Sequence, residues 1–288
     1  ISKIDSITGA EAARYDISGN GGCSNPSRTA VNATGAVWVA CSDNNVVTHI
    51  APEEEQCIDR NGDGIIQTSS VTFDDAGNKN INMLPWQDDE CVLFNGKPIP
   101  ADDAPDDTKN NPITDGCTVG LRGLAVRADN SVVMGGLSDS CMPGHIWQAK
   151  YEYDPELPYE ADVNPRVRLT DHWNLASLSH TDWNGDGCSW DYNGRAYGYA
   201  IDQQGNAWIS SLTTHIGWVD LENRRACSFP SSATYGIAID YAGRVWLGDW
   251  SGSNVIGWVF EPSTKTMHGV SQWENGGNFW EGTNLPAS

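Results

Sequence analysis

Small and apolar residues recur in a ten-residue pattern along the chain. The four copies are "AVNATGAVWV", "AVRADNSVVM", "AIDQQGNAWI" and "AIDYAGRVWL", which begin at Ala30, Ala125, Ala200 and Ala238. Each copy opens with a small and a β-branched residue, carries Gly or Asn in its middle, and ends with apolar residues or Trp. This pattern is typical of a β-hairpin whose turn needs positive φ, and it excludes a helical period.

A third strand is predicted after every copy, in "NNVVTHI", "PGHIWQA", "THIGWVD" and "NVIGWVF", and a fourth in "RRACSF" and "TKTMHGV" after the last two copies. Four antiparallel strands per repeat are typical of a β-propeller blade, which buries its faces by stacking on its neighbours. The sequence therefore predicts an all-β propeller of about five four-stranded blades, within a range of four to seven. A β-sandwich with decorated loops is the alternative.

The whole chain, residues 1–288, is expected to form one propeller domain with two long insertions. The copies begin 95, 75 and 38 residues apart, and only the last spacing suits a compact blade, so insertions are predicted at about 51–120 and 150–196. The opening "ISKIDSITGAEAARYDI" resembles the last two strands of a blade. The tail "SQWENGGNFWEGTNLPAS" is expected to complete it, unless a second copy does so or the chain is part of a longer propeller.

The charge balance argues against nucleic acid and anionic membranes as partners. Asp and Glu number 38 against 17 Lys and Arg, a formal charge of −21, so the mean field repels phosphate groups. No apolar run approaches the roughly 20 residues that cross a bilayer, and no charged region followed by an apolar one opens the chain. We expect a soluble chain from which any export signal has been removed or left out.

The eight cysteines lack the C-x-x-C spacing of a zinc site, which favours disulfides over a metal or a set of reduced thiols. Disulfides and an acidic surface indicate a secreted, periplasmic or cell-surface protein. Pairing between nearest neighbours is the expected connectivity. The predicted pairs are Cys23 with Cys41, Cys57 with Cys91, Cys117 with Cys141, and Cys188 with Cys227.

Oxygen-bearing residues alternate in "CIDRNGDGIIQTS", which begins at Cys57. An EF-hand-like calcium loop places ligands at alternate positions, a glycine at its sixth and an acid at its twelfth. Counting from Asp59, Gly64 is that glycine, but Ser70 stands where the acid belongs. The predicted Ca²⁺ ligands in this loop are Asp59, Asn61, Asp63, the carbonyl of Ile65, and Gln67. The alternative is a solvated turn.

The missing acid is expected from "WQDDEC", because a bridge between Cys57 and Cys91 would draw Asp88, Asp89 and Glu90 toward the loop. A second, less complete loop stands in "DWNGDGCSWD", and a second ion is predicted there with less support. Its candidate residues are Asp182, Asn184, Asp186, Cys188 and Asp191. Hard oxygen ligands suit calcium rather than zinc or copper, and ions at these places would order the insertions.

The segment "YGIAIDYAGRVWLGDWSGSNVIGWVFEPSTK" is similar to propellers of the streptogramin lyase and NHL-repeat type. The resemblance implies a propeller fold, and in the lyases a metal and a histidine base at the start of the innermost strands. The corresponding stretches here are "PSRTAV", "LRGLAV", "AYGYAI" and "TYGIAI", and they contain no histidine. Whether the chain is an enzyme therefore stays uncertain, and a non-catalytic role is favoured over a lyase or hydrolase with an altered active site.

Other side chains stand where the resemblance implies a base. The predicted ligand-binding ring consists of Arg28, Arg122, Tyr197 and Tyr235, which suits a small polar or anionic ligand. His49, His145 and His215 begin third strands and are expected to pack blades, whereas His172 and His180 lie in the second insertion.

The sequence thus predicts a secreted, calcium-stabilised propeller that acts as a binding or structural protein outside the cell. Tryptophans expected in loops or the tail would suit recognition of a protein or glycan ligand. They are Trp86, Trp173, Trp183, Trp190, Trp250, Trp273 and Trp280. The alternative is that they cover the poorly packed insertions. An incomplete first blade would also permit self-association, because open strand edges pair readily.

Overall fold

The chain is almost entirely β in the part that the computed structural model describes. The described residues are 1–110, 113, 120–136, 144–160, 163–182, 187–188, 196–213, 215–231, 233–249, 255–261 and 266–273. The helices among them are short: η1 (Glu54–Gln56), α1 (Asp106–Asn110) and η2 (Leu175–Ser177). None of the helices in these ranges has the length and apolar character needed to span a bilayer.

Each ten-residue repeat forms the two innermost strands of an antiparallel sheet, as predicted. The first sheet has the order β3 (Pro26–Val31), β4 (Val37–Cys41), β5 (Val47–Ile50), β8 (Val92–Gly96). The second has the order β10 (Leu121–Val126), β11 (Val132–Gly136), β12 (His145–Glu152), β13 (Arg166–Asn174), with β9 (Ile99–Pro100) parallel to β13.

The third and fourth repeats follow the same plan. The third sheet has the order β14 (Ala196–Ile201), β15 (Ala207–Ser211), β16 (His215–Asp220), β17 (Arg225–Pro230). In the fourth unit β18 (Thr234–Ile239) pairs with β19 (Val245–Asp249), and β20 (Val255–Glu261) pairs with β21 (Thr266–Trp273), with β19 beside β20.

The turn of every repeat has the predicted backbone conformation. Gly35, Asn130, Gly205 and Gly243 occupy the same repeat position, and their φ values are +88°, +63°, +85° and +80°. L side chains other than Asn rarely adopt such values, which explains the residue choice.

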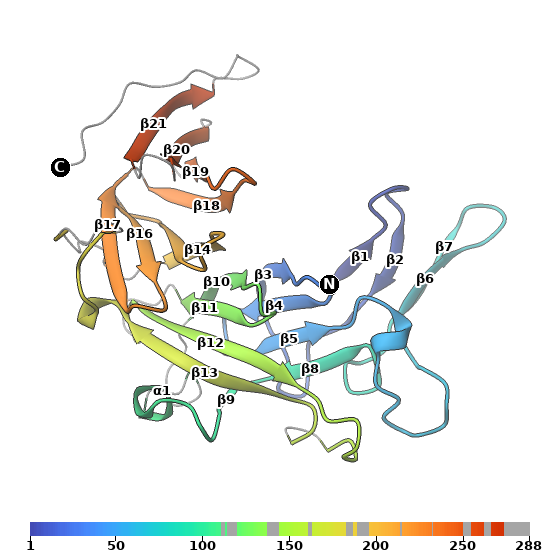
Figure 1. Cartoon of the computed structure of the whole chain (residues 1–288). Coiled ribbons are helices and arrows are strands. Elements are labelled where there is room, and N and C mark those ends of the chain that lie inside the picture. The colour runs from blue at the N-terminus through green and yellow to red at the C-terminus, as the bar shows by residue number, and fades with distance from the viewer. Residues whose placement is uncertain are drawn as a thin grey trace.

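The four sheets are arranged as neighbouring blades. Innermost strand β3 lies next to β10, β10 next to β14, and β14 next to β18, and the units follow one another along an arc (Figure 1). The apolar cores lie between sheets: one cluster joins Trp38 and Phe94 of the first sheet to Met134 and Trp147 of the second. Further clusters join the second sheet to the third and the third to the fourth. This radial stacking is the packing of a β-propeller.

The two long insertions were expected to lie outside the blades, and this expectation is wrong in part. Strand β8 lies inside the first insertion and β13 inside the second, and each is the fourth strand of the preceding repeat's sheet. Trp173 was therefore also misplaced in a loop. It belongs to β13, is 1% exposed, and its indole donates to the carbonyl of Leu221 at 3.1 Å.

The opening segment forms the predicted strand pair, β1 (Ser2–Ile4) and β2 (Glu11–Arg14), which pair only with each other among the described strands. Ala13, Tyr15 and Ile17 pack against the first sheet on the face opposite the second sheet's cluster. Strand β2 also contacts a hairpin from the first insertion, β6 (Ser70–Phe73) and β7 (Lys79–Asn82). The pair thus stands where a preceding blade would stack.

The prediction that the tail completes the pair of β1 and β2 is wrong for the first three tail residues. Residues 271–273 belong to β21 and pair with β20, at the end of the arc away from β1 and β2 (Figure 1). Residues 274–288 lie outside the described part, so closure by them stays a prediction.

The contact between the second and third blades depends on two glycines, which leave room for a tyrosine ring. Tyr199 of β14 is buried over Gly123 and Gly135, which are register partners in β10 and β11. A Cβ atom on either glycine would overlap the Tyr199 ring. Gly236 occupies the same repeat position as Gly123, but a Cβ there meets nothing within 4 Å.

We expect Gly123→Ala to destabilise the protein by about 1–3 kcal/mol or more, because the ring of Tyr199 must move within a packed core. Gly236→Ala, the matched control, should leave the Tm within about a degree of the parent value. Thermal unfolding followed by circular dichroism measures both variants. Equal Tm values for the two variants would contradict this account of the interface.

Candidate functional site

The innermost strands all begin with a break in register. The shift lies between Pro26 and Arg28 in β3, and at the equivalent places in β10, β14 and β18. A β-bulge re-aims the side chains beside it. The residues at the same bulged position are Ser27, Arg122, Tyr197 and Tyr235.

This alignment corrects the predicted ring by one residue in the first blade. Ser27, and not Arg28, is the equivalent of Arg122, while Arg28 replaces a residue that is glycine in the other three repeats: Gly123, Gly198 and Gly236. Sequence reasoning missed Ser27, although counting back three residues from the first alanine of each repeat would have found it.

The structure nevertheless brings all four predicted residues together. The guanidinium carbon of Arg28 lies 4.6 Å from the Tyr197 ring centroid and 4.9 Å from that of Tyr235. The Arg122 guanidinium lies 5.7 Å from the Tyr197 ring and donates to Ser27 Oγ at 3.3 Å. We call Ser27, Arg28, Arg122, Tyr197 and Tyr235 the Arg–Tyr cluster, and it links the first blade to the fourth.

The two phenols are inequivalent. Tyr197 is 6% exposed and donates its hydroxyl proton to the Tyr235 oxygen at 2.7 Å. Burial and this donated bond raise the pKa of Tyr197. The pKa of Tyr235 is lowered, first by the hydrogen bond from Tyr197 and then by one from Arg28. Tyr235 is therefore the phenol whose oxygen carries more negative character.

The cluster is cationic within an acidic protein. Neither Arg28 nor Arg122 forms an ion pair with a carboxylate among the described residues. Two guanidinium groups over aromatic faces, without a carboxylate partner there, provide planar donors that suit a carboxylate or phosphate.

Removal of the Arg28 charge should raise the pKa of Tyr235, because Arg28→Gln deletes both a hydrogen bond and a nearby cation. A pH titration of tyrosine ¹³Cζ resonances measures this pKa. Arg127→Gln is the control, since Arg127 bonds Gln148 Oε1 at 2.6 Å at the opposite end of β10. An unchanged Tyr235 titration in Arg28→Gln would contradict the assigned contact.

The predicted first calcium loop has the expected backbone shape. Asp59 accepts hydrogen bonds from the backbone nitrogens of Gly62 and Gly64 at 2.7 and 2.8 Å, and Gly64 has φ +80°. Asp63 Oδ1 accepts from the nitrogen of Ile65 at 2.8 Å. The side chains of Asn61 and Gln67 bond each other at 2.8 Å and both reach Asp63. Three of the four side chains predicted as ligands, Asn61, Asp63 and Gln67, thus contact one another in an exposed loop, while Asp59 caps its backbone.

The acidic segment after Trp86 does approach this loop, and the Cys57–Cys91 bridge is formed. Glu90 accepts from the backbone nitrogens of Arg60 at 2.7 Å and Gln67 at 2.8 Å, so it ties the loop's two ends together. Asp89 instead accepts from Thr68 Oγ1 and the nitrogen of Ser69, and Asp88 is exposed. A direct ligand role for these three acids stays a prediction.

No group of three or more His, Cys, Asp or Glu side chains placed to hold a metal ion occurs among the described residues. The first loop offers two carboxylates, Asp59 and Asp63, and two side-chain amides. In the second predicted loop Asn184, Asp186 and Asp191 lie outside the described residues. Within it, the Asp182 carbonyl accepts from Arg225 at 3.2 Å, and Cys188 is half-buried.

Three of the predicted disulfides are present: Cys23–Cys41, Cys57–Cys91 and Cys188–Cys227. The fourth, Cys117 with Cys141, falls outside the described residues. No described cysteine is a free thiol. Nearest-neighbour pairing is confirmed for the three bridges that can be seen.

Two histidines meet in a way that the sequence did not indicate. His145 Nδ1 lies 2.8 Å from His172 Nε2, across the pairing of β12 and β13. Burial lowers the pKa of both rings, and that of His172 falls to about 4 with a further contribution from His145. The contact was missed because β13 was expected in a loop, so no signal placed His172 beside the third strand.

No family model and no curated protein matches this chain. Similar solved structures include a Bacteroides uniformis protein assigned as a 6-phosphogluconolactonase, with 10% identity and a TM-score of 0.48 over 96% of this chain and 64% of that one. Another is a catalytically inactive virginiamycin B lyase of Staphylococcus aureus with quinupristin, with 11% identity and a TM-score of 0.41 over 93% and 75%. A gluconolactonase of Xanthomonas campestris has 16% identity and a TM-score of 0.31 over 77% and 68%.

Streptogramin lyases are thus among the structures that the chain resembles, as its repeats suggested. The chain spans 64% of the length of the Bacteroides protein. Because every one of these TM-scores lies below 0.5, the likeness carries no conclusion about activity.

Proposed function

We propose that this chain is an extracellular binding protein that holds a small anionic ligand at the Arg–Tyr cluster. The observation that carries the proposal is the meeting of Arg28 and Arg122 with Tyr197 and Tyr235 where the innermost strands begin. A cluster assembled from all four repeats at one end of their strands is where a propeller gathers side chains for recognition.

Charge supports this choice of ligand. The chain carries a formal charge of −21, so its mean field disfavours anions everywhere except where cations are concentrated. Guanidinium groups bind carboxylates and phosphates through two parallel N–H donors. The hydrogen bond from Arg28 to the Tyr235 oxygen helps to orient the Arg28 donors. The proposal assigns no reaction to the cluster.

Calorimetric titration with gluconate, citrate and inorganic phosphate tests the proposal. At least one of these anions should bind, and Arg28→Gln or Arg122→Gln should weaken it about tenfold or more, as expected for a charge-assisted hydrogen bond. Affinity should fall as sodium chloride is added. Arg127→Gln should bind like the parent protein. Binding of none of the anions, or equal binding by all variants, would refute the proposal.

A bound Ca²⁺ ion is proposed as a stabilising part of the protein. The side chains of Asp59, Asn61 and Asp63 would hold it together with the Ile65 carbonyl and Gln67, which are hard oxygen donors. The fit is supported by Gly64, whose positive φ permits the sharp turn, and by the mutual contact of the Asn61, Asp63 and Gln67 side chains. The ion would neutralise two carboxylates and order a loop with little core of its own.

Calcium removal should lower the Tm, since an ion that binds only the folded state at a hundred times its Kd stabilises by about 2.7 kcal/mol. Thermal unfolding in EDTA and in excess calcium measures the difference, which Asp63→Asn should abolish. Asp74→Asn is the matched control: Asp74 caps an exposed turn in the same way, accepting from the nitrogens of Ala76 and Asn78. An equal Tm of the parent protein in EDTA and in excess calcium would contradict the proposed calcium site.

Secretion and assembly complete the proposal. Three disulfides favour an oxidising compartment. The two-stranded sheet of β1 and β2 offers strand edges with no partner among the described strands, which favours strand exchange with another copy as a second, structural role.

A further inference from the structure

The turn of the third and fourth repeats holds the blade's tryptophan by a hydrogen bond. In the third repeat Trp208 Nε1 donates to Asp202 Oδ2 at 3.0 Å, and in the fourth Trp246 Nε1 donates to Asp240 Oδ2 at 3.0 Å. The other oxygen of each aspartate accepts backbone nitrogens of its own turn. One carboxylate thus satisfies both the turn and the indole, which is buried in Trp208 and half-buried in Trp246.

The first repeat cannot make this bond, because Asn32 replaces the aspartate. Asn32 Oδ1 accepts from the nitrogens of Thr34 at 3.1 Å and Ala36 at 2.8 Å, so the oxygen of the amide is assigned by two backbone donors. Its Nδ2 therefore stands in place of the second carboxylate oxygen and can only donate. Trp38 is fully buried, and its Nε1 has no hydrogen-bond partner.

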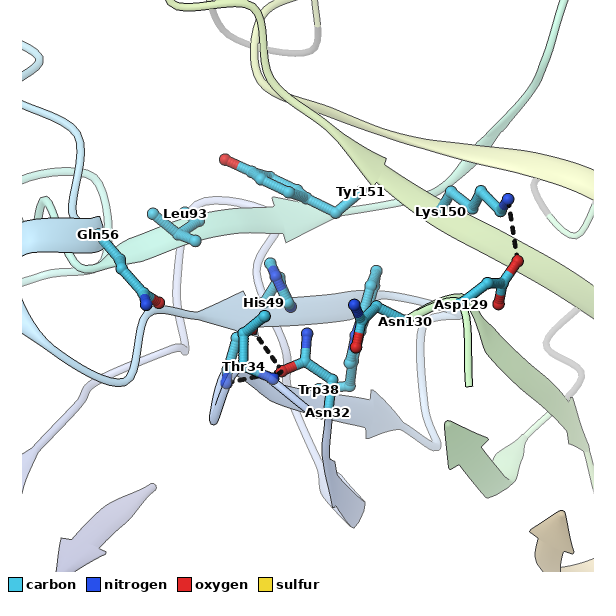
Figure 2. Close-up of a pocket in the computed structure, with 11 residues that line it drawn as sticks. Asn32, Thr34, Trp38, His49, Gln56, Leu93, Asp129, Asn130, Lys150 and Tyr151 are labelled. Atoms are coloured by element: carbon cyan, nitrogen blue, oxygen red, sulfur yellow. Dashed lines mark hydrogen bonds and ion pairs between the residues drawn. The ribbon is translucent and has the colours of Figure 1, made fainter. Parts of the chain in front are cut away.

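Both residues, Asn32 and Trp38, belong to the lining of a cavity of about 290 Å³ between the first and second blades. Asn32, Trp38 and His49 line it from the first blade, and Lys150 and Tyr151 from the second. In Figure 2 Tyr151 and Lys150 lie on one side of this space, with Asn32, Asn130 and His49 opposite them. Its volume exceeds that of one water molecule, about 30 Å³, several times over.

Two more residues of the cavity lining carry a buried polar atom without a hydrogen-bond partner. His49 is 4% exposed, and its Nδ1 has no partner; nor has the buried Tyr151 hydroxyl. The Trp38 and His49 rings lie 4.3 Å apart, and the His49 and Tyr151 rings 4.7 Å apart. Native interiors rarely leave such groups unpaired. Three such atoms on residues that line one cavity favour a polar molecule as its occupant.

The cavity carries no net charge. Burial lowers the pKa of His49 to about 4, so its ring is neutral at pH 7. At the rim, Lys150 pairs with Asp129 at 3.0 Å. Burial of Asp129 opposes its ionisation, but hydrogen bonds from Ser131 and Lys150 outweigh this and lower its pKa to about 2. An anion or a cation would therefore find no uncompensated partner here.

We propose that this cavity between the first two blades binds a neutral sugar residue, with Trp38 and Asn32 donating to one of its oxygens. Aromatic rings beside amide groups and neutral hydrogen-bonding atoms suit the apolar face and the hydroxyl groups of a pyranose. The site lies at the end of β3 away from Arg28, so it is separate from the anion site proposed above.

Titration with methyl β-glucopyranoside, methyl β-galactopyranoside and N-acetylglucosamine tests this proposal. The indole ¹H–¹⁵N resonance of Trp38, assigned with Trp38→Phe, should shift with at least one of these sugars. Asn32→Asp restores the acceptor found in the third and fourth repeats, so it should fold, bond the indole internally and weaken sugar binding about tenfold or more. Asp202→Asn breaks the same bond in the third blade and should leave sugar binding unchanged.

Arg28→Gln, which disables the anion site, should also retain sugar binding, so failure of one proposal is distinguishable from failure of the other. A Trp38 resonance unmoved by all three sugars would overturn the assignment, and so would equal binding by Asn32→Asp. A shift caused by inorganic sulfate and by none of the sugars would overturn the neutral ligand class.

Discussion

The packing of each sheet against the next is the interaction on which the rest of this structure depends. A four-stranded sheet with apolar residues on both faces cannot bury them alone, and the clusters here accordingly mix residues of neighbouring sheets. The contact is close enough that Gly123 and Gly135 must lack side chains for Tyr199 to fit. Because the innermost strands are thereby held side by side, residues far apart in the chain meet at their ends, from Tyr197 with Tyr235 to Arg28 with Tyr235.

Functional specialisation follows from small departures within this repeat. Where three repeats have glycine, the first has Arg28, which reaches the two tyrosines of later blades. Where two repeats have aspartate at the turn, the first has Asn32, which leaves the indole of Trp38 without its acceptor. Both departures place hydrogen-bond donors at opposite ends of β3. The same strand thus contributes to two chemically different candidate sites.

The two insertions supply strands to the blades in addition to forming surface loops. Strands β8 and β13 complete the first two sheets after detours of many residues, and the disulfide between Cys57 and Cys91 closes the first detour at its base. Glu90 then ties the two ends of the predicted calcium loop to this base. An ion in the loop would therefore act on a segment already fixed at one end.

The sequence by itself determined the hairpin repeats, their turns and three of the cysteine pairings, because these depend on residues near one another in the chain. Positive φ at Gly35 and Asn130 follows from local sterics. The tertiary structure alone decided the fourth strands of the first two sheets, the contact of His145 with His172, and the place of Ser27 in the Arg–Tyr cluster. These depend on strand pairing and bulges between segments far apart, where hydrogen bonding and burial, not local sequence preference, select the partner.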